Sequence, residues 1–292
     1  MYYKTTPYKI FYVFNVLFLS FLAFTCILPL IHVLAVTLSG NAPASANLVK
    51  LWPIDFTLDS YEKTIGNENF INSLWISVKR TALGTSIGMI LIFLSAYALS
   101  KDDERFPGRT AYTWFFVFTM LFSGGLVPTF NLVVGLGLKN SIWALILPNA
   151  VNVWLMILML NFFRGIPKEL EEAAIMDGAS QPRILFNIYL PLSLPSIATL
   201  SLFTMVFHWN AWFDGILYMN DNSKYPLATF LQTIIVQQDI SQLVLNPEDL
   251  ENLSERTVKS AQIFIGALPI LLIYPFLQKY FVKGIVLGAV KG

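Results

Sequence analysis

Six long apolar stretches dominate the sequence and restrict how the chain can fold. They run over residues 10–38, 81–100, 111–134, 141–163, 190–217 and 261–282. Each is at least as long as the ~18–20 residues that a helix needs to cross the hydrocarbon core of a bilayer. Only helices and closed barrels satisfy their backbone in lipid, and these stretches lack the alternation of barrel strands. The sequence therefore predicts an all-α integral membrane protein with six transmembrane helices in a single transmembrane domain over residues 1–292.

Composition supports this class and excludes several others. Only 13% of the residues are charged, whereas soluble domains carry roughly 25%. The net charge is +1, so the chain lacks the basic field that a nucleic-acid-binding protein uses. One cysteine, Cys26, excludes an intrachain disulfide and a cysteine metal cluster. The two histidines, His32 and His208, are too far apart in sequence to argue for a metal site.

The first apolar stretch has two interpretations. Lys4 and Lys9 resemble the start of a signal peptide, and residues 42–46 contain small residues at cleavage-like spacing. The apolar run is nevertheless longer than the ~7–15 residues of a signal-peptide core, so we expect a retained helix. Lys and Arg then set the orientation, because cytoplasmic loops are enriched in them. With the N-terminus inside, 11 of the 19 fall in inner segments and 8 in outer ones, which predicts cytoplasmic N- and C-termini.

Two connections are long and are expected outside the cell membrane. They cover residues 39–70 and 218–260. Within the second, residues 226–238 are mildly apolar but too short and too rich in Gln to span a bilayer. We expect a short external helix or a re-entrant piece there.

A polar segment, residues 165–191, separates the fourth and fifth apolar stretches and has the turn chemistry of helix, turn and helix. Pro167 suits a first helical position, and acids follow in the early turns, where the helix dipole favours them (Glu169, Glu171 and Glu172). Gly178 is a natural left-handed stop. Ser180 can cap a second helix, which would carry an apolar stripe of Ile184, Leu185, Ile188 and Leu192.

The same segment resembles a known motif at every position. The pattern is Glu172-Ala173-Ala174-x-x-Asp177-Gly178-Ala179, then eight residues, then Ile188-x-Leu190-Pro191. It is similar to the EAA loop of bacterial ABC importer permeases, the type I or MetI-like superfamily. The resemblance extends from about residue 70 to the C-terminus, for example at residues 72–73, 97–98, 106–108 and 284–292. It is strongest to the carbohydrate-uptake branch, and there to the smaller permease of maltose and oligosaccharide transporters.

The resemblance implies a role for each part of residues 165–191. A coupling helix from about Pro167 to Met176 would dock on a cytoplasmic ATPase, with Glu172 facing it and Gly178 allowing the sharp turn that follows. The implied ATPase-coupling residues are Glu172, Ala173, Ala174, Asp177, Gly178 and Ala179.

The resemblance also implies a set of partners. They are a second, non-identical permease, two copies of the ATPase, an extracytoplasmic sugar-binding protein and membrane lipid, in a bacterial cytoplasmic (inner) membrane. No Gly-x4-Gly-Lys-Ser/Thr occurs, so we expect this chain to bind no cofactor and ATP with Mg to bind the ATPase.

Polar and aromatic residues gather late in the fifth apolar stretch: His208, Trp209, Asn210, Trp212 and Asp214. Ionisable groups in a spanning helix are costly and usually face a bundle interior or water, which favours a sugar pathway. An aromatic belt at the membrane interface is the alternative, because Asp214 lies close to the helix end. Gly84-x-x-x-Gly88 in the second stretch suggests close helix packing, although glycine is common in membrane helices.

The functional hypothesis is a permease subunit of an ATP-driven importer for an oligosaccharide or polysaccharide fragment, without enzymatic chemistry of its own. An ABC permease for another solute is the nearest alternative. An ion-coupled secondary transporter would need paired intramembrane acids and inverted repeats, and the sequence has neither. A membrane-embedded enzyme would need clustered catalytic residues within the helices.

Overall fold

The computed structural model describes residues 5–241 and 255–289, and every element in those residues is a helix. The chain divides into two compact units, which are described separately. Unit 1 contains residues 1–71 and 233–268, and unit 2 contains residues 72–232 and 269–292.

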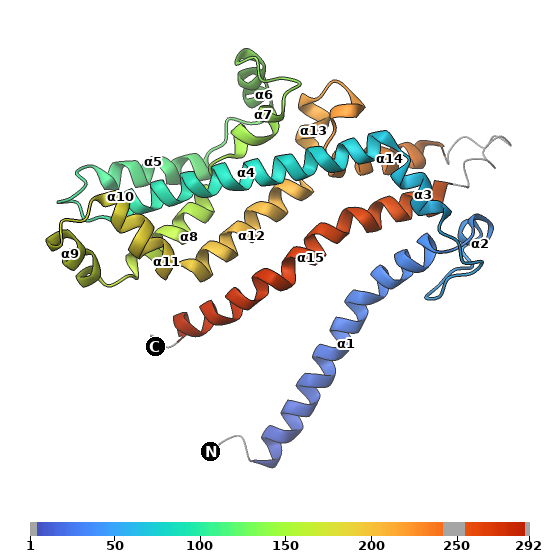
Figure 1. The fold of residues 1–292 in the computed structure, drawn as a ribbon, viewed down its shortest axis with the longest axis horizontal. Coiled ribbons are helices and arrows are strands. Elements are labelled where there is room, and N and C mark those ends of the chain that lie inside the picture. Colours follow the sequence, from blue (N-terminus) through green and yellow to red (C-terminus); the bar gives the residue numbers. More distant parts are fainter. Residues whose placement is uncertain (1–4, 242–254, 290–292) are drawn as a thin grey trace. The chain divides into compact units, whose positions relative to one another are not determined.

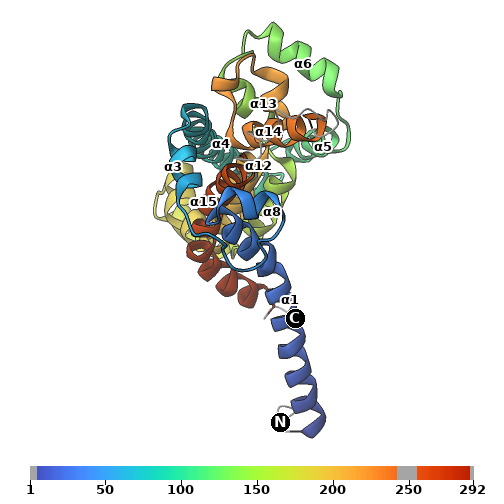
Figure 2. The ribbon, with the colours of Figure 1, turned by 90° about the vertical axis from the view of Figure 1, so that its right-hand side faces the viewer.

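Unit 1 begins with the long helix α1, Thr6–Thr37, which is drawn in blue in Figure 2. Most side chains in the first two-thirds of this helix are exposed. A helix that is apolar all round is suited to lipid. Only its last turn is buried, in a small core with α2 (Asn41–Ser45). Helix α3 (Asp59–Ile65) is tied to the same turn, because the Ser60 hydroxyl donates to the carbonyl oxygen of Thr37.

Unit 2 holds the elements that position the site. Its longest helix, α4, runs over Glu68–Ser100 and begins just before the unit boundary. The helices that follow are α5 (Arg109–Leu121), α6 (Leu126–Gly135), α7 (Ile142–Ile146), η2 (Leu147–Asn149), α8 (Val153–Arg164) and α9 (Lys168–Met176). Then come α10 (Gln181–Ile184), η3 (Leu185–Tyr189), α11 (Leu190–Leu192), α12 (Leu194–Asn210), α13 (Phe213–Tyr218) and η4 (Asn222–Lys224). Helices α14 (Leu227–Ser241) and α15 (Glu255–Ala289) each contribute to both units.

Unit 2 contains two separate apolar cores, built from helices that Figure 1 shows apart from one another. The larger is built where α4, α8, η3 and α12 meet, around Ile92, Met156, Phe163 and Ile184. The smaller joins α6, α7 and α13 through Val133, Leu145 and Tyr218. Helix α9 lies at the end of unit 2 that the larger core fills.

The membrane helices differ from six straight spans. Three helices are long and apolar enough to cross a bilayer, and the number rises to six if each of three bent pairs is one span. The bends are 112° between α5 and α6, 50° between the 142–149 and 153–164 segments, and 84° between the 181–192 and 194–210 segments. Gly125, with φ +88°, stands at the first bend. Pro148 and Pro195 lie near the other two bends. Proline has no backbone N–H to donate within a helix, so it favours a break there.

One expected helix needs correction. The fifth apolar stretch, expected to be one helix over residues 190–217, ends a helix at Asn210 and starts another at Phe213. His208 and Asp214 are therefore on different helices, α12 and α13. The piece expected at residues 226–238 is the helix α14, whereas residues 242–254 of the same connection lie outside the described residues.

The Gly84-x-x-x-Gly88 packing prediction is confirmed. A Cβ at Gly84 would stand 2.5 Å from Nε2 of His208, and one at Gly88 would stand 3.1 Å from the carbonyl oxygen of Ala150. The two glycines let α4 approach α12 and the backbone just before α8.

Candidate functional site

The 165–191 segment folds as its turn chemistry predicts, because each turn residue has a matching backbone role. Pro167 is the N-cap of α9, one position earlier than expected, and Glu169 and Glu171 lie in the first turn. Gly178 has φ +75°, and its N–H donates to the carbonyl oxygen of Ile175 at 2.9 Å. The N–H of Ala179 donates to the carbonyl oxygen of Ala174 at 2.9 Å. This bonding pattern is a Schellman motif, in which glycine at the left-handed position ends the helix.

The second half of the segment packs α10 and η3 into the larger core. Ser180 is the N-cap of α10 without a side-chain cap bond, and Pro182 lies in its first turn. Ile184 and Leu185 are buried, whereas Leu192 is exposed. The expected stripe therefore divides between the core and the surface.

Helix α9 presents one face to unit 2 and the other to its surroundings. Of the residues that the motif implies for coupling, Ala174 and Ala179 pack against the larger core. Glu172, Ala173, Asp177 and Gly178 are exposed. Apolar side chains share the exposed face, with Leu170, Ile175 and Met176 all open to contact. A short helix with this exposed apolar and acidic surface is suited to docking.

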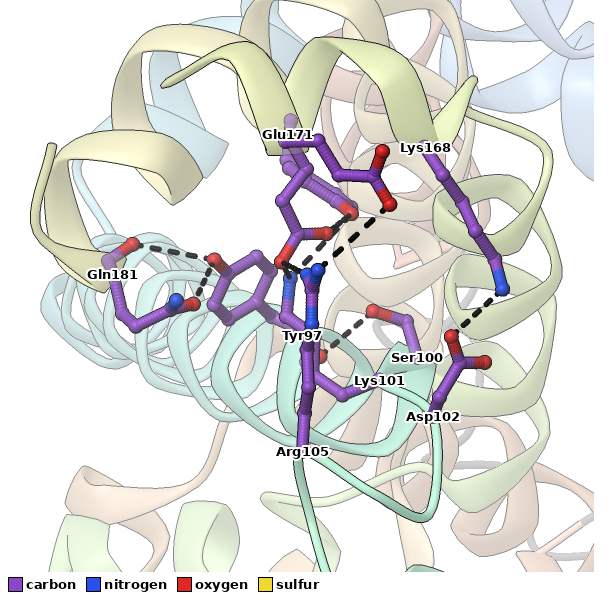
Figure 3. A network of polar contacts seen from close by, with 10 residues as sticks. Tyr97, Ser100, Lys101, Asp102, Arg105, Lys168, Glu171 and Gln181 are labelled. Atoms are coloured by element: carbon purple, nitrogen blue, oxygen red, sulfur yellow. Dashed lines mark hydrogen bonds and ion pairs between the residues drawn. The ribbon is translucent and has the colours of Figure 1, made fainter. Parts of the chain in front are cut away.

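The two adjacent acids of α9 have opposite environments. The side chain of Glu172 is 61% exposed and reaches Arg105 only at 3.9 Å. The side chain of Glu171 is 6% exposed and accepts hydrogen bonds from Lys101 at 2.8 Å, Arg105 at 2.9 Å and the Tyr189 hydroxyl at 2.6 Å. We call these four residues, Lys101, Arg105, Glu171 and Tyr189, the Glu171 cluster (Figure 3).

Two aromatic rings lie close to the ammonium group of Lys101. Nζ of Lys101 lies 3.7 Å from the ring centroid of Tyr97 and 4.5 Å from that of Tyr189. The two rings meet edge to face at 4.9 Å between centroids. The Tyr97 hydroxyl donates to Oε1 of Gln181, in α10, at 2.6 Å (Figure 3). Together with the bond from Lys101 to Glu171, this links the end of α4 to both α9 and α10.

The electrostatics of the cluster favour an ionised carboxylate. Burial alone would raise the pKa of Glu171, but hydrogen bonds from Lys101 and Tyr189 and the positive charges of Lys101 and Arg105 outweigh it. The pKa of Glu171 is therefore lowered below its ordinary value. Nearby, Lys168 of α9 pairs with Asp102 at 2.7 Å on the exposed surface. A surface pair of this kind adds little stability, whereas the buried cluster fixes geometry.

The polar and aromatic residues predicted for a sugar pathway separate into two groups. His208 and Trp209 are buried, and His208 packs against Gly84. Asn210 and Trp212 are exposed. Asp214 forms an ion pair with Arg80 of α4, whose side chain is fully buried.

A half-open cavity lies beside Thr204, one helical turn before His208 on α12. It has a volume of about 280 Å³ and opens at the break before α8, where Asn149 and Asn152 meet Gly88 of α4 and Thr204 of α12. Gly88 is 12 residues from the end of α4 and Thr204 is 10 residues from the start of α12, so both lie ~15–18 Å along their helices. Within a membrane, irregular backbone such as the break before α8 is tolerated only against protein or a water-filled cavity.

Two functional residues escaped the sequence reasoning. Glu171 was grouped with Glu172, and only helix geometry separates the buried acid from the exposed one. Arg80 had a usable signal, because an arginine within an apolar helix needs a partner. No feature of the sequence links Arg80 to its partner Asp214, which is 134 positions away.

The fold and these sites define an integral membrane subunit with a short, partly exposed helix, α9, that ends in a Schellman turn. A family model for "binding-protein-dependent transport system inner membrane component" matches residues 1–287. The chain belongs to this family. It is a permease subunit of an ABC importer and not itself an enzyme, and permeases of this kind work with an ATPase and a solute-binding protein.

Individual relatives agree with this assignment. The chain is 43% identical to the polygalacturonan/rhamnogalacturonan transport system permease protein YtcP of Bacillus subtilis (strain 168), over 94% of this chain and 96% of the relative. It is 39% identical to protein LplC of the same organism, over 99% and 97%. Among solved structures, it is similar to a chain in the crystal structure of a bacterial ABC transporter involved in the import of the acidic polysaccharide alginate. That match has a TM-score of 0.84 and 32% identity, and it covers 95% of this chain and 98% of the other.

Proposed function

We propose that this chain is one of two related, non-identical permeases of an importer for oligosaccharides or polysaccharide fragments. The observation that carries the proposal is the 43% identity, across nearly the whole chain, to a permease named for polygalacturonan and rhamnogalacturonan transport. The structural relative's transporter is named for alginate, which is also an acidic polysaccharide. An extracytoplasmic binding protein would deliver the sugar, and two ATPase copies would bind ATP with Mg. We place both chain termini and residues 165–191 on the cytoplasmic side, and the connections 39–70 and 218–260 outside.

In this proposal α9 is the coupling helix. Its exposed face carries Leu170, Ile175 and Met176 beside Glu172, a combination that suits a cleft in the ATPase. The Schellman turn at Gly178 sets the angle between α9 and α10. We place the sugar pathway at the end of α12, where Asn210 is exposed, at the exposed Trp212 in the break that follows, and at the cavity beside Thr204, which offers amide and hydroxyl groups.

Reconstitution tests the substrate class. The chain would be co-purified with its partners, placed in liposomes with ATP inside, and offered labelled oligogalacturonides, a neutral arabinooligosaccharide or an amino acid. We expect ATP-dependent uptake of a sugar oligomer that requires the binding protein. Uptake of the amino acid alone would replace the proposal with a permease for another solute.

Variants of α9 test the coupling surface. Val at position 178 costs ~1–2 kcal/mol in the left-handed region, whereas Asn tolerates it. Gly178→Val and Glu172→Lys should leave the permease inserted but weaken co-purification of the ATPase or its stimulation by the loaded binding protein. Gly178→Asn is the matched control for the turn, and Glu104→Lys, which reverses an exposed acid outside α9, is the control for the charge. Normal coupling in both test variants would mean that residues 165–191 are only a connector.

A further inference from the structure

The coupling helix is held to unit 2 in two mechanically different ways. Its covalent connections to α8 and α10 both pass through glycine turns, at Gly165 and Gly178. Both turns are hydrogen-bonded and set the directions in which the chain enters and leaves α9, but neither turn joins α9 to α4. The middle of α9, by contrast, is joined through Glu171 to Lys101 and Arg105, directly after α4, by charge-assisted hydrogen bonds of 2.8 and 2.9 Å.

The part of α4 around Arg80 is also anchored to its neighbours by hydrogen bonds. Nη1 of Arg80 donates to the carbonyl oxygen of Ala211 at 2.9 Å and to Oδ1 of Asp214 at 3.0 Å. Its Nη2 donates to the carbonyl oxygen of Leu145 at 3.3 Å. A single side chain of α4 therefore holds the break between α12 and α13 together with the end of α7. One turn earlier, the Ser77 hydroxyl accepts the N–H of Leu227 at 2.7 Å.

Between these two anchors α4 is an unbroken rod. It contains 33 residues without proline, whereas the other three membrane segments between residues 109 and 210 are bent by 50° or more. Tyr97 and Arg80 are 17 residues apart, which corresponds to ~26 Å along the helix axis. A displacement applied at one end of α4 is carried to the other, because α4 is one continuous hydrogen-bonded helix between the two anchors.

We propose that α4 transmits the movement of the coupling helix to the opposite end of the permease, and that Glu171 is the positioning residue that joins α9 to it. This inference rests on the proposed function. Glu171 does not bind ATP or sugar, and it differs from Glu172, which we assign to the ATPase surface. When α9 moves with the ATPase, the Glu171 cluster displaces α4. Arg80 then repositions the α12–α13 break and the end of α7, where the sugar would enter.

The test follows movement at the far end of α4. Lys79 is exposed and adjacent to Arg80 but outside its contacts, so Lys79→Cys in a Cys26→Ser background provides a reporter. In the reconstituted complex, thiol reactivity at position 79 should change between the resting and the ATP-trapped state. Glu171→Gln should abolish that change and lower sugar transported per ATP hydrolysed about tenfold, within the range of measured coupling between sites. Glu104→Gln, at an exposed acid in the loop after α4 and outside α9, is the matched control.

A second variant separates transmission from simple loss of structure. Glu171→Cys with Lys101→Cys should uncouple transport when reduced. A bifunctional thiol reagent that spans the replaced side chains should restore both transport and the reporter change. The inference is overturned if Glu171→Gln keeps the wild-type reporter change, or if the cross-linked pair stays uncoupled although the complex is intact. Failure of the unmodified complex to transport any sugar would instead overturn the proposed function.

Discussion

Removing the buried guanidinium of Arg80 should destabilise the permease strongly. The side chain is fully buried and bonds both oxygens of Asp214, whose own side chain is 15% exposed. It also supplies a donor to the carbonyl oxygen of Ala211, where the backbone breaks between α12 and α13. Arg80→Met therefore leaves a nearly buried carboxylate and a carbonyl without their main donor.

The magnitude follows from these contacts. Breaking a buried ion pair from one side costs ~3–5 kcal/mol. Asp214→Asn should cost less, because the amide oxygen still accepts from Arg80 and the carbonyl bonds remain. The double variant Arg80→Met/Asp214→Leu removes both charges, so only the carbonyl oxygens of Ala211 and Leu145 lose their Arg80 donor, at ~1–3 kcal/mol for an unsatisfied group. The double variant should therefore be more stable than Arg80→Met alone.

Heating the detergent-purified complex and measuring the intact fraction by gel filtration would rank the variants. Lys79→Met is the control, since an exposed substitution usually changes stability by less than ~0.5 kcal/mol. The expected order, from most to least stable, is control, double variant, Arg80→Met. A double variant whose loss equals the sum of the losses measured for Arg80→Met and for Asp214→Leu would show that Arg80 and Asp214 act independently, and the reasoning would be refuted.

Three further predictions test separate features. Gly84→Ala should destabilise by ~1–3 kcal/mol through overpacking against His208, whereas Gly135→Ala, with open space around it, should not; thermal unfolding of the two variants compares them. At pH values above the ordinary pKa of about 4.5, ionised Glu171 adds to the stability of the protein, and this contribution is lost as the pH falls through the lowered pKa. The stability difference between the unchanged protein and Glu171→Gln should therefore be present at neutral pH and vanish in acid. Cysteine labelling of intact cells should modify position 55 but neither 104 nor 180, and the reverse pattern would contradict the proposed orientation.

Local chemistry made the 165–191 segment predictable. Pro167 and Gly178 act on the backbone within their own turn, so the helix start and the left-handed stop could be placed without a tertiary fold. The apolar stretches likewise identified the membrane class, because length and hydropathy alone decide whether a helix can span a bilayer.

The bends in the membrane helices and the partners of the buried charged residues are found only in the tertiary structure. Hydropathy is averaged over a window, so it does not register the break at residues 211–212, which has neither Gly nor Pro. Periodicity assigns residues to a helix face but does not say what that face contacts. Glu171 and Glu172 are adjacent and chemically identical, and only the packing of α9 against the end of α4 buries one and exposes the other. The pairing of Arg80 with Asp214 was decided in the same way, because the contact depends on how distant helices cross and not on either local sequence.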